Sequence, residues 1–474
     1  MEVQAFEVEN IPLHSCENFK DRFHWYMYFC AFSAHLLITA CGMSATWFLP
    51  VIPVLQSNDT QINPLETPVT TLQLSMLVSI PVCAGGLSFL FWSKILDKFG
   101  RKTTMQFLSI ISIFSLLVLS FAEDIYTLVI FLSLHKMCIS GSMISAIVYT
   151  SEISSDTTRG KMSCLLSIQV PFGILIGYIL GSVTSVRYFT LICGVPFILY
   201  LVLSPLLAES PRYLLSKQRN FEVMKELRKL RGNMANIEYE NTKSMLLTTT
   251  PSKQSTFLSI FRQTRSRKSF ILSSEIIIFD QFSGITAVVT YVGVIFDSVN
   301  TGLKGNEVAI IIGFTKILAF SISLYFVDRI GRRPLILFSI FMCMFSLFVL
   351  GVYFHQVHIG SQLFDNIRWL PILFIIIYII VYSIGLGVVP LAFTGEIFSD
   401  HLRAVGVGYV LIIAVLVSAI VSFIFPIIKD FYGLHWCFWL FCIVSFVGFI
   451  RIYLTMPETK NKTFLEIQNM LNGM

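Results

Sequence analysis

The sequence is unusually poor in charged residues: Asp, Glu, Lys and Arg together make up only 13% of its 474 residues. A soluble domain carries about 25% charged residues. Hydrophobic residues reach 55% of the chain, and Phe alone occurs 43 times. So little charge cannot cover a water-exposed surface. The composition therefore excludes a soluble globular protein and indicates a polytopic helical membrane protein.

The sequence also lacks the motifs of an enzyme. It has no glycine-rich nucleotide loop, no nucleophile at a fixed spacing from a base, and no cluster with metal-ligand spacing. Nearly all of the ten cysteines lie within apolar runs, where they serve as small packing residues. We expect a protein that is not an enzyme and that binds no metal or cofactor.

Apolar runs long enough to cross a bilayer occur twelve times, at 26–50, 72–93, 104–122, 125–149, 163–184, 188–207, 270–296, 306–327, 334–354, 369–394, 404–427 and 434–456. A polar, basic segment divides six spans from six. The expected organisation is an N-terminal segment, a six-helix bundle, a linker with short helices, a second six-helix bundle and a tail, at 1–25, 26–207, 208–269, 270–456 and 457–474. The predicted fold class is an all-α membrane protein.

Lys and Arg lie mostly on one side of the predicted spans. The loops on the side of residue 100 carry ten, and the 208–269 segment adds thirteen, whereas the opposite loops hold only Arg187, Lys304, Arg368 and Lys429. The positive-inside rule then predicts that both termini and the linker lie in the cytoplasm. The basic residues orient the chain in the bilayer, so no nucleic-acid partner is expected. Asn58, in the sequon Asn-Asp-Thr of the first outside loop, is a candidate glycosylation site.

Two motifs recur in the same order in both halves. "DKFGRK" (97–102) and "DRIGRR" (328–333) share the pattern Asp-x-x-Gly-Arg-Lys/Arg, and a Glu seven residues before an Arg follows each of them. The offsets between the copies are similar, 231 residues (97 to 328) and 244 residues (152 to 396). This similarity indicates an internal duplication.

We expect the repeated charges to form two ionic clusters at helix ends on the cytoplasmic side, one of Asp97, Arg101, Glu152 and Arg159 and one of Asp328, Arg332, Glu396 and Arg403. Pairs that close only when the cytoplasmic side is shut would bias an inward–outward equilibrium. The simpler alternative is that these charges only orient the loops.

Several further segments carry a resemblance: "YTSEISSDTTRGK" (149–161), "AESPRYLLSK" (208–217), "DQFSGITAVVTY" (280–291), "TGEIFSDHLRAVG" (394–406) and "PETKNKTFLEI" (457–467). Together with the repeated loops they resemble the sugar porters of the major facilitator superfamily, and the first is similar to insect facilitated trehalose and hexose transporters. The resemblance implies two pseudo-symmetric six-helix bundles that act as a monomer. It also implies a small-molecule sugar held mainly by spans 1, 5, 7, 8, 10 and 11, and moved by alternating access.

The resemblance transfers Gln281, Thr286, Tyr291 and Pro390 to the substrate-binding set. Other positions depart from the family pattern. The first Gln of the span 7 motif is Asp280, the Trp after Pro390 is Leu391, and the span 11 Asn-Trp pair is Ala414-Val415. The span 5 Gln aligns with Ser167, and Gln169 lies two residues further along, so both are added as candidates.

Asp280 and Lys316 are candidates from the sequence itself, because each is a charge inside an apolar span. Asp280 follows Lys268 by twelve residues, and Lys316 precedes Asp328 by twelve, so each lies about 18 Å from the cytoplasmic surface. A lone charge at this depth costs roughly 2.5–3.5 kcal/mol on insertion scales. Equal depth on consecutive spans predicts an Asp280–Lys316 ion pair.

Three uses of that pair remain open: recognition of a charged or strongly polar ligand, proton coupling, and a structural lock between two spans. The predicted function is facilitative transport of a hexose or a trehalose-like disaccharide. One alternative is a proton-coupled sugar symporter that uses Asp280. An alternative of another class is a non-transporting sugar sensor on a transporter scaffold.

Overall fold

The computed structural model describes residues 24–65, 67–155, 158–248, 261, 264–297, 302–361, 367–398, 400–460, 462, 466 and 470. Over these residues it contains twelve helical segments that are long and apolar enough to cross a membrane. Lipid offers no hydrogen-bond partners to the backbone, so each apolar run satisfies its own N–H and C=O groups by forming a helix. The predicted all-α membrane fold is confirmed.

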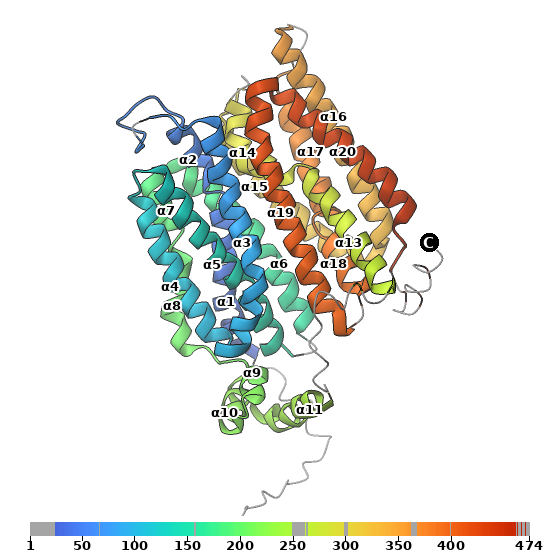
Figure 1. Ribbon diagram of the computed structural model, residues 1–474. Helices are drawn as coiled ribbons and strands as arrows, with labels where there is room; N and C mark the ends of the chain where they lie inside the picture. Colours follow the sequence, from blue (N-terminus) through green and yellow to red (C-terminus); the bar gives the residue numbers. More distant parts are fainter. Residues whose placement is uncertain are drawn as a thin grey trace, which may run out of the picture.

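The first six spans form one bundle (Figure 1). Its helices are α1 (His24–Ala45) with α2 (Phe48–Leu55), α3 (Thr71–Phe99), α4 (Arg101–Ser120), α5 (Ile125–Ile153), α6 (Arg159–Val183), and α7 (Val186–Ile192) with α8 (Val195–Leu203). Asn58 is exposed in the loop between α2 and α3.

The second bundle contains α13 (Thr264–Phe282) with α14 (Ile285–Asp297), α15 (Gly305–Ile330), α16 (Arg332–Ile359), α17 (Leu370–Ile384) with α18 (Val389–Ile397), α19 (Asp400–Tyr432) and α20 (Leu434–Thr455). Between the bundles, the linker forms α9 (Pro211–Ser216), α10 (Asn220–Arg231) and α11 (Ala235–Thr248) below one end of the first bundle (Figure 1). We call that end of the molecule the linker face, and the other end the opposite face.

Several helices run further than the predicted limits at the linker face, and α3 and α15 are two examples. α3 continues from residue 93 to Phe99 and α15 from residue 327 to Ile330, and each ends at a glycine. Gly100 has φ of 94° and Gly331 has φ of 109°, values at which a residue with a Cβ is strained. The predicted spans end too early because charged residues occupy the last turns of these helices, where the apolar pattern is interrupted. The repeated motif therefore marks two matching helix-to-helix turns.

Contacts between the bundles lie from the middle of the molecule to the opposite face. The Tyr178 hydroxyl of α6 donates to the backbone carbonyl of Val289 in α14 at 3.0 Å. The Thr71 hydroxyl at the start of α3 donates to Asp430 near the end of α19 at 2.6 Å. α3 and α19 lie side by side (Figure 1). By contrast, residues 163–170 in the linker-face half of α6 are all partly or fully exposed. The bundles thus meet mainly towards the opposite face.

Within the first bundle, α1 and α6 approach each other unusually closely. A Cβ added to Gly173 would lie 2.1 Å from the Thr39 carbonyl oxygen, and one added to Gly42 would lie 2.3 Å from the Val170 carbonyl oxygen. Small residues at such crossings let helix backbones pack against each other in lipid, where no hydrophobic force draws them together. These glycines fix the position of α1, and with it the break between α1 and α2.

Candidate functional site

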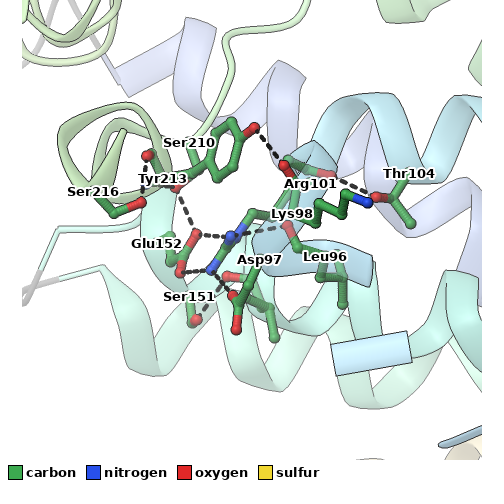
Figure 2. A network of polar contacts seen from close by, with 12 residues as sticks. Leu96, Asp97, Lys98, Arg101, Thr104, Ser151, Glu152, Ser210, Tyr213 and Ser216 are labelled. Atoms are coloured by element: carbon green, nitrogen blue, oxygen red, sulfur yellow. Dashed lines mark hydrogen bonds and ion pairs between the residues drawn. The ribbon is translucent and has the colours of Figure 1, made fainter. Parts of the chain in front are cut away.

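An ionic cluster lies at the linker face of the first bundle (Figure 2). The Arg101 guanidinium at the start of α4 donates to both carboxylate oxygens of Glu152 in α5, at 2.9 and 3.0 Å. It also pairs with Asp97 of α3 at 3.2 Å. The Ser210 hydroxyl donates to Glu152 at 2.5 Å, which joins the linker to the cluster. The Arg101 and Glu152 side chains are only 10% and 8% exposed, so this bidentate pair is largely removed from water.

Glu209 holds the first turn of α4 from the linker side. Its carboxylate accepts from the backbone N–H groups of Arg101, Lys102 and Ser210, at 3.2, 3.3 and 2.8 Å. A helix N-terminus favours a carboxylate through its unpaired N–H groups and its dipole. Burial nevertheless raises the pKa of Glu209, and these three N–H groups only partly oppose the shift.

A second cluster occupies the corresponding place in the second bundle. The Arg332 guanidinium of α16 donates to Glu396 of α18, with Nε and Nη2 at 3.1 and 3.0 Å from Oε1. The Thr459 hydroxyl donates to the other Glu396 oxygen at 2.6 Å. The Glu396 side chain is 31% exposed, so this pair is wetter than its counterpart.

Glu458 holds the first turn of α16 as Glu209 holds that of α4. It accepts from the backbone N–H groups of Arg332 and Arg333, each at 3.0 Å, and of Lys460 at 2.9 Å. Burial tends to raise the pKa of Glu458, but these N–H groups outweigh burial and lower it. The two equivalent carboxylates therefore have pKa values displaced in opposite directions.

Glu209→Gln and Glu458→Gln are expected to change stability with opposite pH slopes. Glu209 contributes most to folding stability at a pH below its unfolded pKa. This stability is lost as the pH rises through its raised folded pKa. Replacing Glu209 therefore becomes less harmful as the pH rises. Glu458 contributes above its unfolded pKa and loses the contribution as the pH falls, so its replacement becomes more harmful with rising pH. Unfolding temperatures in detergent between about pH 4 and 8 check this, and parallel slopes would contradict it.

The two ion pairs each lie within a single bundle. Arg101 meets Glu152 inside the first bundle, and Arg332 meets Glu396 inside the second. Both are formed in a conformation whose bundles meet mainly towards the opposite face. Neither pair therefore requires contact between the bundles, and the hypothesis that these pairs close only when the linker face shuts stays a prediction. Their immediate role is to hold the helix ends of each bundle together.

Three other members of the predicted clusters cannot be placed. The side chains of Arg159, Asp328 and Arg403 lie outside the part of the chain that the structure describes. Their membership of the clusters stays a prediction.

Asp280 lies in the last turn of α13 and is 5% exposed. Its Oδ2 accepts from the Gln281 side-chain amide at 2.7 Å, and the Tyr382 side chain of α17 lies beside the carboxyl group. Its Oδ1 is buried and has no hydrogen-bond partner among the described residues. No ion pair joins Asp280 to Lys316 in the described part of the chain. The predicted ion pair is wrong for this conformation.

The break in span 7 explains why equal depth did not bring these charges together. α13 and α14 are separated at Gly284, which has φ of 89°. The outer piece, α14, packs on α15, whereas α13 packs mainly on α18, α19 and α20. α15 instead packs on α17 and on α6 of the other bundle. Consecutive spans thus diverge at the level of the two charges.

Gln281 and Thr286, both predicted to bind substrate, belong to a short polar chain. The Thr286 hydroxyl donates to the Gln281 side-chain oxygen at 3.4 Å, and the Ser418 hydroxyl of α19 donates to Thr286 at 3.1 Å. The Gln281 amide donates to Asp280. Gln281 and Thr286 are partly exposed, which leaves room for further partners.

Tyr291 and Pro390 have structural partners instead. The Tyr291 hydroxyl donates to the backbone carbonyl of Ser422 at 3.2 Å, and its ring stacks on Phe425 with ring centroids 5.0 Å apart. Tyr291 therefore fixes α14 to α19. Pro390 is buried, and its carbonyl accepts from the Thr394 hydroxyl at 2.7 Å.

Of the α6 candidates, Gln169 faces α1. Its side-chain oxygen accepts from the Thr39 hydroxyl at 2.9 Å. Ser167 donates to the backbone carbonyl of Ser163 at 2.9 Å, in its own helix. Both side chains are partly exposed on the linker-face half of α6.

Family comparison agrees with this architecture. The family described as "Sugar (and other) transporter" matches residues 21–471. The chain belongs to this family.

Curated relatives and solved structures extend the comparison. The facilitated trehalose transporter Tret1 of Drosophila mojavensis is 26% identical over 452 residues, 95% of this chain and 52% of the relative. The Tret1-2 homolog of Drosophila simulans is 27% identical, over 84% of this chain and 81% of the relative. The chain spans about half the length of most of these relatives. The inward open conformation of the xylose transporter XylE from E. coli has a TM-score of 0.78 at 18% identity, covering 94% of this chain and all of that one.

Several residues that shape the candidate site were missed from the sequence. Glu209 and Glu458 occur within the motifs "AESPRYLLSK" and "PETKNKTFLEI", each just after the last apolar span of its half. They lie 108 and 126 residues along the chain from Arg101 and Arg332, whose N–H groups they bind. The family resemblance marked these segments but not the backbone groups that they bind. Thr39 and Ser418 are ordinary polar residues in apolar helices, and no pattern distinguishes them from other such residues.

Proposed function

We propose that the protein carries a small sugar across the plasma membrane by alternating access, without chemical change. The observation that carries this proposal is the family match over residues 21–471. The arrangement of two six-helix bundles that meet mainly towards one face supports it, since rocking of the bundles would expose a shared path to the other side. As a transporter, the protein is not an enzyme and needs no cofactor.

The linker face is proposed to be cytoplasmic, because the basic loops and the linker lie there. Both termini then lie in the cytoplasm, and Asn58 lies outside, where its exposure suits a glycan. The proposed working unit is the monomer, surrounded by lipid.

The proposed substrate is a hexose or a trehalose-like disaccharide. Tret1 relatives are named facilitated trehalose transporters, and XylE is named a xylose transporter. The partly exposed side chains of Gln281, Thr286, Gln169 and Ser167 offer the amide and hydroxyl groups that bind sugar hydroxyls. Lys316 and Asp280 belong to the same proposed set.

Proton coupling is a second candidate, and the surroundings of Asp280 favour it. Among the described residues, one oxygen of this buried carboxyl group has no partner and no cation pairs with it, and such a carboxylate is expensive when ionised. A neutral carboxyl group suits this position in the present conformation. If the other conformation exposes Asp280 to water, the group can release its proton there and couple proton movement to sugar movement.

Uptake into proteoliposomes of a panel of labelled sugars, with and without a pH gradient, tests both candidates. Uptake of a hexose or trehalose without a gradient is the expected result for facilitated transport. Strict dependence on the gradient that Asp280→Asn abolishes would establish the proton-coupled alternative. Asp124→Asn, at the cap of α5, is the control and should leave any gradient dependence unchanged. No uptake, combined with sugar-induced thermal stabilisation, would contradict transport and indicate a sensor.

A further inference from the structure

Lys316 is a charged side chain in the middle of α15 that nothing in the described part of the chain pairs or hydrogen-bonds. Its position shares a helical face with the buried residues Ile312, Ala319 and Ser323, at spacings of three to four residues. The exposed, lipid-facing residues of α15 lie on the other side of the helix, at Phe314, Leu318, Ile322 and Tyr325. Lys316 thus faces protein, and it is still partly exposed.

The neighbours of α15 place this amine at the boundary between the bundles. Gly313 of α15 lies against Leu175 and Tyr178 of α6, which belongs to the first bundle. Lys316 follows Gly313 by three residues, or about 4.5 Å nearer the linker face. At that level α6 becomes partly exposed, since the bundles meet mainly towards the opposite face. On the helical face that it shares with Lys316, the Ser323 hydroxyl of α15 donates to the Ile384 carbonyl of α17 at 3.1 Å.

Lys136, a second lysine within a membrane span, provides a comparison because its amine has a hydrogen-bond partner in the protein. The Lys136 amine of α5 donates to the Ser44 carbonyl at 3.0 Å, next to the break between α1 and α2. His135 contacts the Ser44 hydroxyl at 2.9 Å, so both side chains fix that break. Lys136 therefore has a role in holding the fold together. Lys316 has no comparable contact in the described residues.

We propose that Lys316 binds the carboxylate of a transported sugar acid, such as a hexuronate. This assignment rests on the proposed transport function and names a further substrate class for it. An unpaired ammonium group that is partly removed from water carries a desolvation cost, and pairing with an anion offsets that cost. A solute with one carboxylate would supply this anion. One lysine matches one negative charge, which favours a monoanion over a phosphate dianion.

The rest of the solute would meet neutral partners. Gly313 of α15 lies against Leu175 of α6, and the two helices are antiparallel. Moving from Gly313 past Lys316 along α15 therefore corresponds to moving from Leu175 back towards Gln169 and Ser167 along α6. Their amide and hydroxyl groups suit sugar hydroxyls. Asp280 packs within the second bundle beside Tyr382, so it does not neutralise Lys316.

Competition and uptake in proteoliposomes test the proposal with labelled glucuronate and labelled glucose. The wild type is expected to take up both. Lys316→Met should lower glucuronate uptake relative to glucose about 10- to 100-fold, the loss of one charge-assisted contact. Lys316→Arg should retain most of the preference. Lys136→Met removes the same charge at a structural position, so it should lower both rates without changing their ratio.

Thermal stabilisation of the purified protein by each sugar separates the two proposals. Glucose uptake with no glucuronate uptake or stabilisation would overturn the Lys316 assignment and leave sugar transport standing. So would a Lys316→Met variant with an unchanged ratio. If the wild type transports neither sugar, the transport proposal fails. The stabilisation by glucuronate then decides the assignment, supporting it if Lys316→Met abolishes the effect and overturning it otherwise.

Discussion

Arg101→Ala is expected to destabilise the protein by about 3–5 kcal/mol, the usual cost of removing one partner from a buried ion pair. Glu152 would keep the Ser210 hydroxyl but lose two charge-assisted hydrogen bonds, while its side chain remains only 8% exposed. An uncompensated carboxylate in that position either stays ionised at high cost or takes up a proton. Thermal unfolding in detergent, followed by loss of the monodisperse species, measures the effect.

The second bundle supplies the control for this prediction. Arg332→Ala removes the equivalent cation, but Glu396 is 31% exposed and can be hydrated by water. Its destabilisation should therefore be clearly smaller, towards the value of a solvent-exposed pair, at about 1 kcal/mol. Replacing both partners, as Arg101→Met with Glu152→Leu, should cost less than Arg101→Ala alone. Equal losses for Arg101 and Arg332 would show that burial does not decide the effect.

The repeated charges show how far a pattern in sequence can predict contacts. Arg101–Glu152 and Arg332–Glu396 were predicted because the same residue types recur at matching positions in both halves, and the structure brings both pairs together. Duplication conserves geometry, so a motif that occurs twice restricts where its charges can lie. The pattern does not determine whether the pairs act as a switch, since a repeat fixes which residues pair but not how the pairs respond to movement of the bundles.

The Asp280–Lys316 pair failed for a reason that depth alone cannot reveal. Counting residues from the linker face places both charges near mid-membrane, but it says nothing about lateral position. The Gly284 break turns α13 away from α15, and α15 packs on α17 instead. The quoted motif contained this glycine, yet a glycine in an apolar helix permits a break without requiring one.

Gly173→Ala is the second large prediction, with an expected cost of about 1–3 kcal/mol from overpacking. The added Cβ would lie 2.1 Å from the Thr39 carbonyl oxygen and 3.0 Å from the Gly42 Cα, both backbone atoms that no side-chain rotation can remove. α1 and α6 must separate along their crossing. The Thr39–Gln169 hydrogen bond lies beside that crossing, so it should lengthen or break as well.

Gly408→Ala provides the matched control for the α1–α6 crossing, because nothing lies within 4 Å of the Cβ it would add to α19. Alanine is favoured over glycine in a helix interior by roughly 1 kcal/mol, so this variant should be neutral or more stable. The two substitutions are chemically identical, so changes of opposite sign in their unfolding temperatures would show that the cost arises from helix–helix contact.

Because Thr39 and Gln169 flank the crossing, Gly173→Ala should also weaken sugar-induced stabilisation, whereas Gly408→Ala should not. Equal behaviour of both variants would mean that α1 and α6 can separate at little cost, and that the close approach does not position Gln169.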